Sequence, residues 1–168
     1  TNDPYWPQDA LNSYWNDLAG DKHLLYVPNA GHDLRGIGDD GKKELLPMKA
    51  VNTLAAFCRS QIFDKPMPQL TWEYQASGDF LMVKPIGTVK ALTLWRADSE
   101  TRDFRGSKWT GEVALKDQET KKYDGTLEVG YKLKPNAQPF QAMFGEVTFD
   151  YDGIPLNLST QIRIEVKK

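Results

Sequence analysis

Cysteine, histidine and excess charge are all scarce in this 168-residue chain. A single cysteine, Cys58, excludes a disulfide within the chain, and two histidines at unrelated positions give no zinc-binding spacing. Lys and Arg number 21 against 23 Asp and Glu, so the net charge of −2 excludes a strongly basic nucleic-acid-binding protein. No apolar run reaches the ~18 residues of a membrane span. No cofactor, metal or nucleic-acid partner is predicted.

Apolar and aromatic residues are plentiful enough to form a core. They make up 40% and 11% of the chain, a composition typical of a folded protein. The length fits one domain or two small ones. The chain opens in turn-like residues (TNDPY) with no initiator methionine and no signal sequence. We therefore expect it to be the C-terminal part of a longer polypeptide.

Residues 1–66 read as alternating helix and strand. The run 23–27 is continuously apolar, which favours a strand buried on both faces, as in a parallel sheet. Helical spacing on either side of this run predicts two helices, one carrying Leu11, Tyr14, Trp15 and Leu18, the other carrying Val51, Leu54, Ala55, Cys58 and Ile62. On this second stripe Cys58 is expected to be buried. These elements predict part of an α/β domain over 1–66.

From Leu70 onward the apolar period changes to two, which indicates strands. Gly145 marks a change of phase that predicts a β-bulge, and Asp152-Gly153 indicates a hairpin. The fold class predicted is therefore α/β followed by all-β, with an antiparallel immunoglobulin- or fibronectin-like β-sandwich over 67–168. Seven alternating runs carry this prediction, at 70–76, 80–84, 89–97, 112–116, 127–133, 140–151 and 154–166.

Asp3 and His32 are the candidate catalytic residues. His32 follows the predicted buried strand and a tight turn, and Asp3 lies 29 positions earlier, with a predicted helix between. Side chains after neighbouring parallel strands meet at one sheet edge, so we expect a hydrogen bond of ~2.6–3.2 Å. A carboxylate there fixes the tautomer of an imidazole and stabilises its protonated form. Acid before base is also the chain order of the α/β-hydrolases.

Simpler interpretations of both residues stay open. Asp3 before Pro4 is also typical of a helix N-cap, and a lone histidine after a strand is often a surface residue. No Gly-x-Ser-x-Gly motif occurs, so the nucleophile of any such triad is expected upstream. The charged loop 98–110 is either a solvated loop or a segment long enough to reach over a neighbouring cleft.

Several blocks of sequence carry a resemblance to a known family. They are TNDPYW at 1–6, YVPNAGH at 26–32, LWRADS at 94–99, RDFR at 102–105 with Trp109, FGEVTF at 144–149 and STQ at 159–161. In these blocks the chain resembles the PhoPQ-activated pathogenicity-related family. The resemblance implies the C-terminal fragment of an α/β-hydrolase domain with an appended β-sandwich, in a secreted or periplasmic protein. It also implies that Asp3 is the triad acid and His32 the base.

Two functions follow as hypotheses. The first is the C-terminal portion of a serine hydrolase that cleaves ester or peptide bonds. The second is a non-catalytic, exported binding, signalling or virulence-associated protein that recognises a partner through its sandwich. In both cases residues 1–66 are too few to cover both faces of a sheet. We therefore expect an exposed apolar flank that meets the missing part of the hydrolase domain or another chain.

Overall fold

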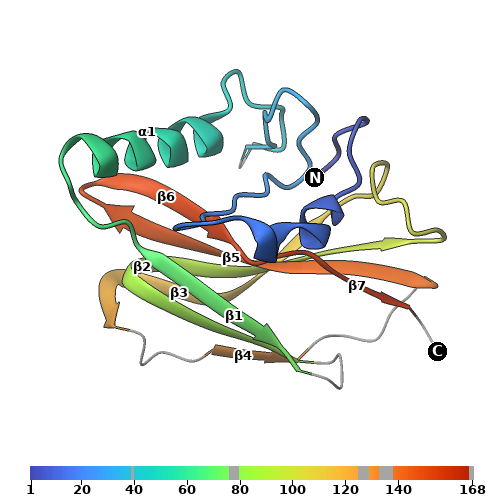
Figure 1. Ribbon diagram of the computed structural model, residues 1–168. Helices are drawn as coiled ribbons and strands as arrows, with labels where there is room; N and C mark the ends of the chain where they lie inside the picture. Colours follow the sequence, from blue (N-terminus) through green and yellow to red (C-terminus); the bar gives the residue numbers. More distant parts are fainter. Residues whose placement is uncertain (39, 76–79, 125–128, 133–137, 167–168) are drawn as a thin grey trace.

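The protein is described here from a computed structural model, which covers residues 1–38, 40–75, 80–124, 129–132 and 138–166. The described residues form mostly antiparallel β-sheet with one α-helix, and the sheet curls into a half-barrel (Figure 1). The elements in chain order are η1 (Ala10–Ser13), η2 (Trp15–Asp17), α1 (Met48–Ile62), β1 (Gln69–Tyr74), β2 (Phe80–Ser99), β3 (Thr110–Asp124), β4 (Val129–Lys132), β5 (Phe140–Tyr151), β6 (Ile154–Ser159) and β7 (Arg163–Val166).

The long strand β2 organises the sheet. Residues 80–86 of β2 pair with β1 and β4, and residues 86–99 pair with β3 on one side and β5 on the other. Gly87 lies between the two parts at φ +142°, where a Cβ would stand 3.0 Å from Pro68 and 3.2 Å from the Phe149 ring. Only glycine accepts this backbone without strain or a clash. The bend at Gly87 therefore lets one strand serve two regions of a curled sheet.

The alternating runs are confirmed as strands within the described residues, with three differences. The predicted run 154–166 divides into β6 and β7, because residues 160–162 are not part of a strand. The runs 80–84 and 89–97 are one strand, because Gly87 bends the backbone without breaking the ladder. All the described strands also join in one curled sheet rather than in the two separate sheets of the expected sandwich. Ala76, Leu127 and Leu133 of the predicted runs lie outside the described residues.

The β-bulge predicted at Gly145 is wrong. β5 has no extra residue there, because it pairs with β2 in unbroken register through Gly145. On the other side of β5, residues 144–145 face the three residues 160–162 between β6 and β7, so the extra residue lies on that side. The phase change has another cause: residues 141–147 are buried without alternation. Phe144 on one face packs with Tyr26 and Trp109, while Val147 on the other belongs to the cluster inside the curl.

The N-terminal region keeps only one of its expected regular elements. Helix α1 is confirmed, but two short 3₁₀ helices replace the helix expected around 11–18, and residues 23–27 are extended without a strand ladder. A parallel strand needs neighbouring strands for its backbone hydrogen bonds. Here the Leu24 carbonyl accepts instead from Ser159 N at 2.7 Å, and Tyr26 N donates to the Ser159 hydroxyl at 3.0 Å.

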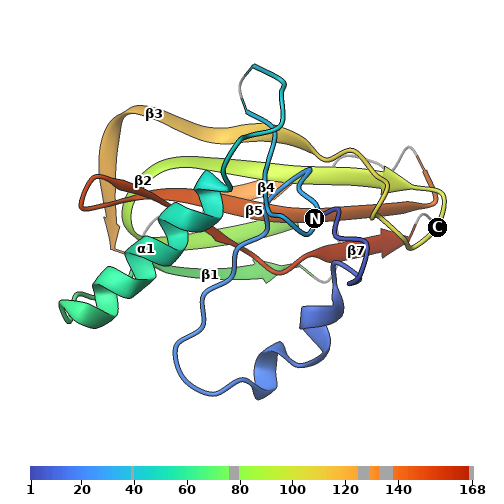
Figure 2. The ribbon, with the colours of Figure 1, turned by 90° about the horizontal axis from the view of Figure 1, so that it is seen from above.

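Helix α1 lies across the sheet beside β6, and the N-terminal segments lie on the same side (Figures 1 and 2). Ala56 is fully buried with the sheet core, and Lys49 reaches the nearly buried carboxylate of Glu146 at 2.8 Å. The predicted apolar stripe of α1 faces outward instead: Leu54 is 62% and Ile62 72% exposed. The expected apolar flank is therefore confirmed.

Cys58, which was expected to be buried, is exposed on this same flank. The periodicity of α1 correctly grouped Cys58 with other apolar residues on one face. It did not tell which face the sheet would cover, because both faces of the helix carry apolar side chains.

The cluster inside the curl predicts a strong effect on stability. Phe149 is fully buried there, so replacing it by alanine should lower the free energy of unfolding by about 3–5 kcal/mol through lost burial and a residual cavity. Phe63 is 60% exposed at the end of α1 and serves as a matched control, expected to change it by less than about 1 kcal/mol. Urea denaturation measures both. Equal effects of the two substitutions would contradict this core assignment.

Candidate active site

Asp3 and His32 lie in contact. The Nδ1 atom of His32 is 2.8 Å from Oδ2 of Asp3, which confirms the predicted hydrogen bond. The other carboxylate oxygen accepts the backbone N–H of Tyr5 at 2.8 Å, and the Tyr5 ring meets the imidazole edge-on at 5.1 Å between centroids. A carboxylate at Nδ1 favours the tautomer with its proton on that atom. Nε2 is then an acceptor, on a side chain that is 67% exposed.

The ionised form of the Asp3 carboxyl group is stabilised by its hydrogen bonds. Its pKa is lowered, first by the hydrogen bond from Tyr5 N–H and then by the hydrogen bond to His32. Both partners favour the ionised carboxylate. Asp3 therefore stays negative near neutral pH and can stabilise an imidazolium whenever Nε2 takes up a proton.

Two backbone turns hold the pair together. Asn2 N donates to the Ala30 carbonyl at 2.8 Å, and the Thr1 nitrogen donates to the Val27 carbonyl at 2.8 Å. Asn29 takes the left-handed conformation at φ +56°, which asparagine tolerates better than most residues. The segments ending at Asp3 and at His32 are thus joined side by side without the parallel sheet on which the prediction was based.

Asp3 borders one cavity, and its near neighbour Tyr5 borders another. A cavity of about 320 Å³ next to Asp3 is lined mainly by apolar side chains, including Trp6, Leu11 and Tyr14. A second cavity of about 710 Å³ lies between residues 5–9 and residues 101–105. Tyr5 and Trp6 are themselves 70% and 66% exposed. The His32 side chain is itself 67% exposed, so a reacting group brought from outside these segments can reach the imidazole.

Comparison with known proteins assigns the chain that carries this site to a family. The model of the PhoPQ-activated pathogenicity-related protein family matches residues 1–105, which include both site residues. The chain belongs to this family. Autocrine proliferation repressor protein A of Dictyostelium discoideum is 29% identical over 117 residues, which cover 62% of this chain and 22% of that protein. The chain thus spans about a fifth of the relative's length. No solved structure matches it.

The loop between β2 and β3, whose residues up to 105 lie in the family match, reaches the site. Arg105 donates to the Pro4 carbonyl at 2.9 Å, and Arg102 pairs with Asp9 at 2.5 Å. The loop is therefore more than a solvated connection. Sequence reasoning proposed its reach but missed its partners. Asn29 is a further contact residue, because its side-chain amide donates to the Trp109 carbonyl at 2.9 Å. Its position after Pro28 in a turn was a local signal, but no local pattern pairs it with Trp109, 80 positions later.

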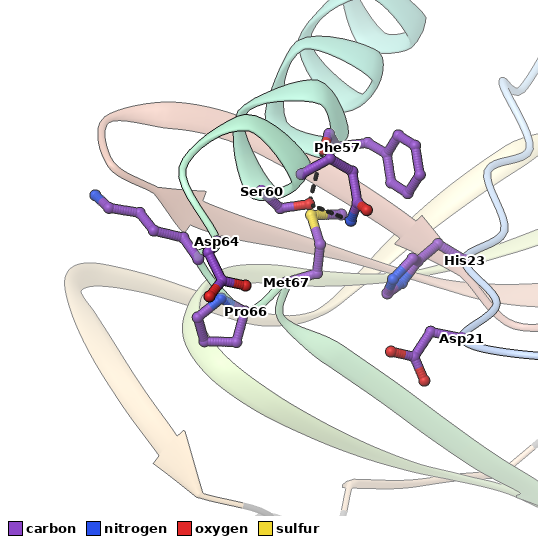
Figure 3. Close-up of a pocket in the computed structure, with 9 residues that line it drawn as sticks. Asp21, His23, Phe57, Ser60, Asp64, Pro66 and Met67 are labelled. Carbon is purple, nitrogen blue, oxygen red and sulfur yellow. Dashed lines mark hydrogen bonds between the residues drawn. The ribbon is translucent and has the colours of Figure 1, made fainter.

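Another cavity, of about 540 Å³, lies between α1 and residues 21–23 (Figure 3). It contains His23, and burial lowers the pKa of that histidine against the opposing effect of Asp21. Ser60 does not provide a nucleophile there, because its hydroxyl donates to the Phe57 carbonyl at 2.7 Å within the helix.

Over the described ranges, no three His, Cys, Asp or Glu side chains gather closely enough to hold a metal ion. In the same part of the chain, no helix has the length and apolar character needed to traverse a bilayer.

Asp103, in the loop beside the site, should titrate at unusually low pH. Hydrogen bonds from the Arg105 side chain and backbone lower the pKa of Asp103 to about 2. Because this pKa is below the unfolded value of about 3.9, the ionised pair stabilises the loop above that pH. The contribution disappears as pH falls toward 2. Carboxyl ¹³C NMR should give that midpoint, and Arg105→Gln should raise it. An ordinary midpoint in the unaltered protein would disprove the ion pair.

Proposed function

We propose that this chain supplies the acid and the base of a serine hydrolase that cleaves ester or peptide bonds. The observation that carries the proposal is the 2.8 Å contact between His32 Nδ1 and the Asp3 carboxylate. The nucleophilic serine and the oxyanion hole would come from residues outside these 168. The proposal includes an α/β-hydrolase domain that contains 1–66 and a secreted or periplasmic location, both in keeping with the family resemblance.

The chemistry assigned to the pair is proton transfer. Nε2 of His32 accepts the proton of the serine hydroxyl while the serine oxygen forms a bond to the substrate carbonyl carbon. The imidazolium then donates this proton to the leaving alcohol or amine as the carbon–oxygen or carbon–nitrogen bond breaks. Water attacks the acyl-enzyme with the same histidine as base, releasing the acid and restoring the serine. Asp3 stabilises the imidazolium in both halves.

The test uses the full-length protein. It should hydrolyse a generic ester such as p-nitrophenyl acetate, and a fluorophosphonate probe should label one serine, located by peptide mass spectrometry. Heat-denatured protein is the control for non-specific labelling. A folded protein that neither turns over esters nor reacts with the probe would contradict the proposal.

A second candidate function is non-catalytic signalling. It is favoured by the name of the relative, an autocrine proliferation repressor, which describes an effect on cells rather than a reaction. The same experiment separates the two. A folded, unlabelled and inactive protein favours signalling, whereas single-serine labelling with turnover favours the hydrolase.

A further inference from the structure

We infer that the loop 100–109 between β2 and β3 positions the Asp3–His32 pair, so that the β-sheet takes part in catalysis. Figure 1 shows the end of β2 and this loop beside the N-terminal segment. The inference rests on the proposed function for its catalytic consequence. The structural part, that the loop sets the geometry of the pair, stands on contacts on both sides of the site.

On the Asp3 side, the loop holds both sequence neighbours of the carboxylate. The Asn2 side-chain amide donates to the carbonyls of Arg105 and Ser107, at 2.9 and 2.7 Å. Arg105 in turn donates from its guanidinium to the Pro4 carbonyl at 2.9 Å. Asp3 is thereby fixed between two residues that are each tied to the same loop.

On the His32 side, the loop is joined to the turn that precedes the imidazole. The amide of Asn29 donates to the Trp109 carbonyl at 2.9 Å, and Trp109 N donates back to the amide oxygen of Asn29 at 2.8 Å. This two-point pairing fixes the side chain and, with it, the left-handed backbone of Asn29. The backbone N–H of Asn29 also donates to the Thr1 hydroxyl at 3.0 Å.

The loop itself is firmly anchored. Phe104 and Trp109 are 0% and 1% exposed and pack with Phe144 of β5, and Ser107 N closes a turn onto the Phe104 carbonyl. Close packing of large side chains gives a rigid support. The geometry of the loop is therefore set by the sheet and passed on to the two turns.

The side chains of the Asp3–His32 pair depend on this support because few neighbouring side chains pack against them. His32 is 67% exposed, so its imidazole is held mainly by the hydrogen bond to Asp3 and the ring contact with Tyr5, and both depend on the backbone segments that carry these residues. Misplacement by about 1 Å costs on the order of 10²-fold in rate. Loosening the loop should therefore lower kcat with far less effect on KM.

Asn29→Asp in the full-length protein is the main test. It keeps the size of the side chain and the acceptor for Trp109 N, but puts a carboxylate oxygen against the Trp109 carbonyl. The matched control is Asn12→Asp, the same change at an amide that also joins the N-terminal region to the sheet, through Ile162 O at 2.7 Å and Gln161 at 3.0 Å. These two hydrogen bonds of Asn12 go to residues that do not belong to the Asp3–His32 pair.

Two measurements decide the outcome. In ¹H and ¹⁵N NMR, assigned with a His32→Gln variant, Asn29→Asp should speed solvent exchange of the His32 Nδ1 proton, and kcat should fall about 10²-fold. Asn12→Asp should change neither. Unchanged His32 signals in Asn29→Asp, or equal changes in both variants, would overturn the inference. If Asn29→Asp fails to fold, Arg105→Gln, at an exposed side chain, should shift the same signals in the same direction. If the unaltered protein is inactive, the proposed function fails while the NMR comparison still decides whether the loop positions the pair.

Discussion

Replacing His32 by alanine in the full-length protein is expected to lower kcat for an ester substrate by about 10⁶-fold. The contact of Nδ1 with Asp3 leaves Nε2 as the one imidazole nitrogen able to take the serine proton. Alanine removes the base for both acylation and deacylation, and water is a poor replacement at neutral pH. Steady-state kinetics with p-nitrophenyl acetate, together with the rate of fluorophosphonate labelling, measure the loss.

His23→Ala is the matched control for this substitution. His23 is the other histidine of the chain, and it lies beside Phe57, at 6.4 Å between ring centroids, in the cavity of Figure 3. Its loss should leave kcat close to that of the unaltered protein. A His32→Ala protein that keeps its turnover would remove His32 from the mechanism and favour the signalling function.

Asp3→Asn has the second largest expected effect, a fall in kcat of about 10⁴-fold. The amide is nearly the same size, so the turn is kept, but two things change. An uncharged group no longer stabilises the imidazolium, and the amide NH₂ can donate to Nδ1, which moves the proton to Nε2 and removes the base. The ¹⁵N shifts of His32 should show this change of tautomer alongside the kinetic loss.

Asp150→Asn controls for the loss of a hydrogen-bonded carboxylate as such. Like Asp3, Asp150 accepts a backbone N–H with one oxygen, from Gly153 at 2.7 Å, and contacts a basic group with the other, Lys90 at 3.0 Å. It lies at the β5–β6 hairpin, so stability is expected to fall slightly while kcat stays unchanged. If both variants lost activity equally, the effect of Asp3→Asn would be one on stability.

The contacts between the β2–β3 loop and the site bear on whether the β-sheet has a catalytic or a binding role. An appended domain that only recognised a partner would have no reason to hold both turns of an acid–base pair. Here Asn2 and Asn29 each bind the loop that leaves β2. The catalytic and binding hypotheses for the sheet are therefore not exclusive, because the contacts with Asn2 and Asn29 involve only the loop that leaves β2.

Interpretation of local patterns succeeded where the determining interactions are short in sequence or repeat along it. A period of two placed the strands, and a period near four placed α1. The contact of Asp3 with His32 was predicted correctly, but from parallel strands that the described residues do not form. The same patterns failed at 11–18 and 23–27, because an isolated amphipathic turn or apolar run acquires regular structure only against a neighbour that satisfies its backbone groups and covers its side chains.

Composition and periodicity thus decided that this chain carries a β-rich half, a helix with an apolar stripe, and a carboxylate and an imidazole able to meet. Three-dimensional packing alone decided that β2 continues through Gly87 to join a single curled sheet and that the apolar stripe of α1 faces outward. It also decided that the side chain of Asn29 hydrogen-bonds to the backbone of Trp109. The reason is physical: these outcomes depend on contacts between residues up to about a hundred positions apart, and such contacts leave no periodic trace in the order of the amino acids.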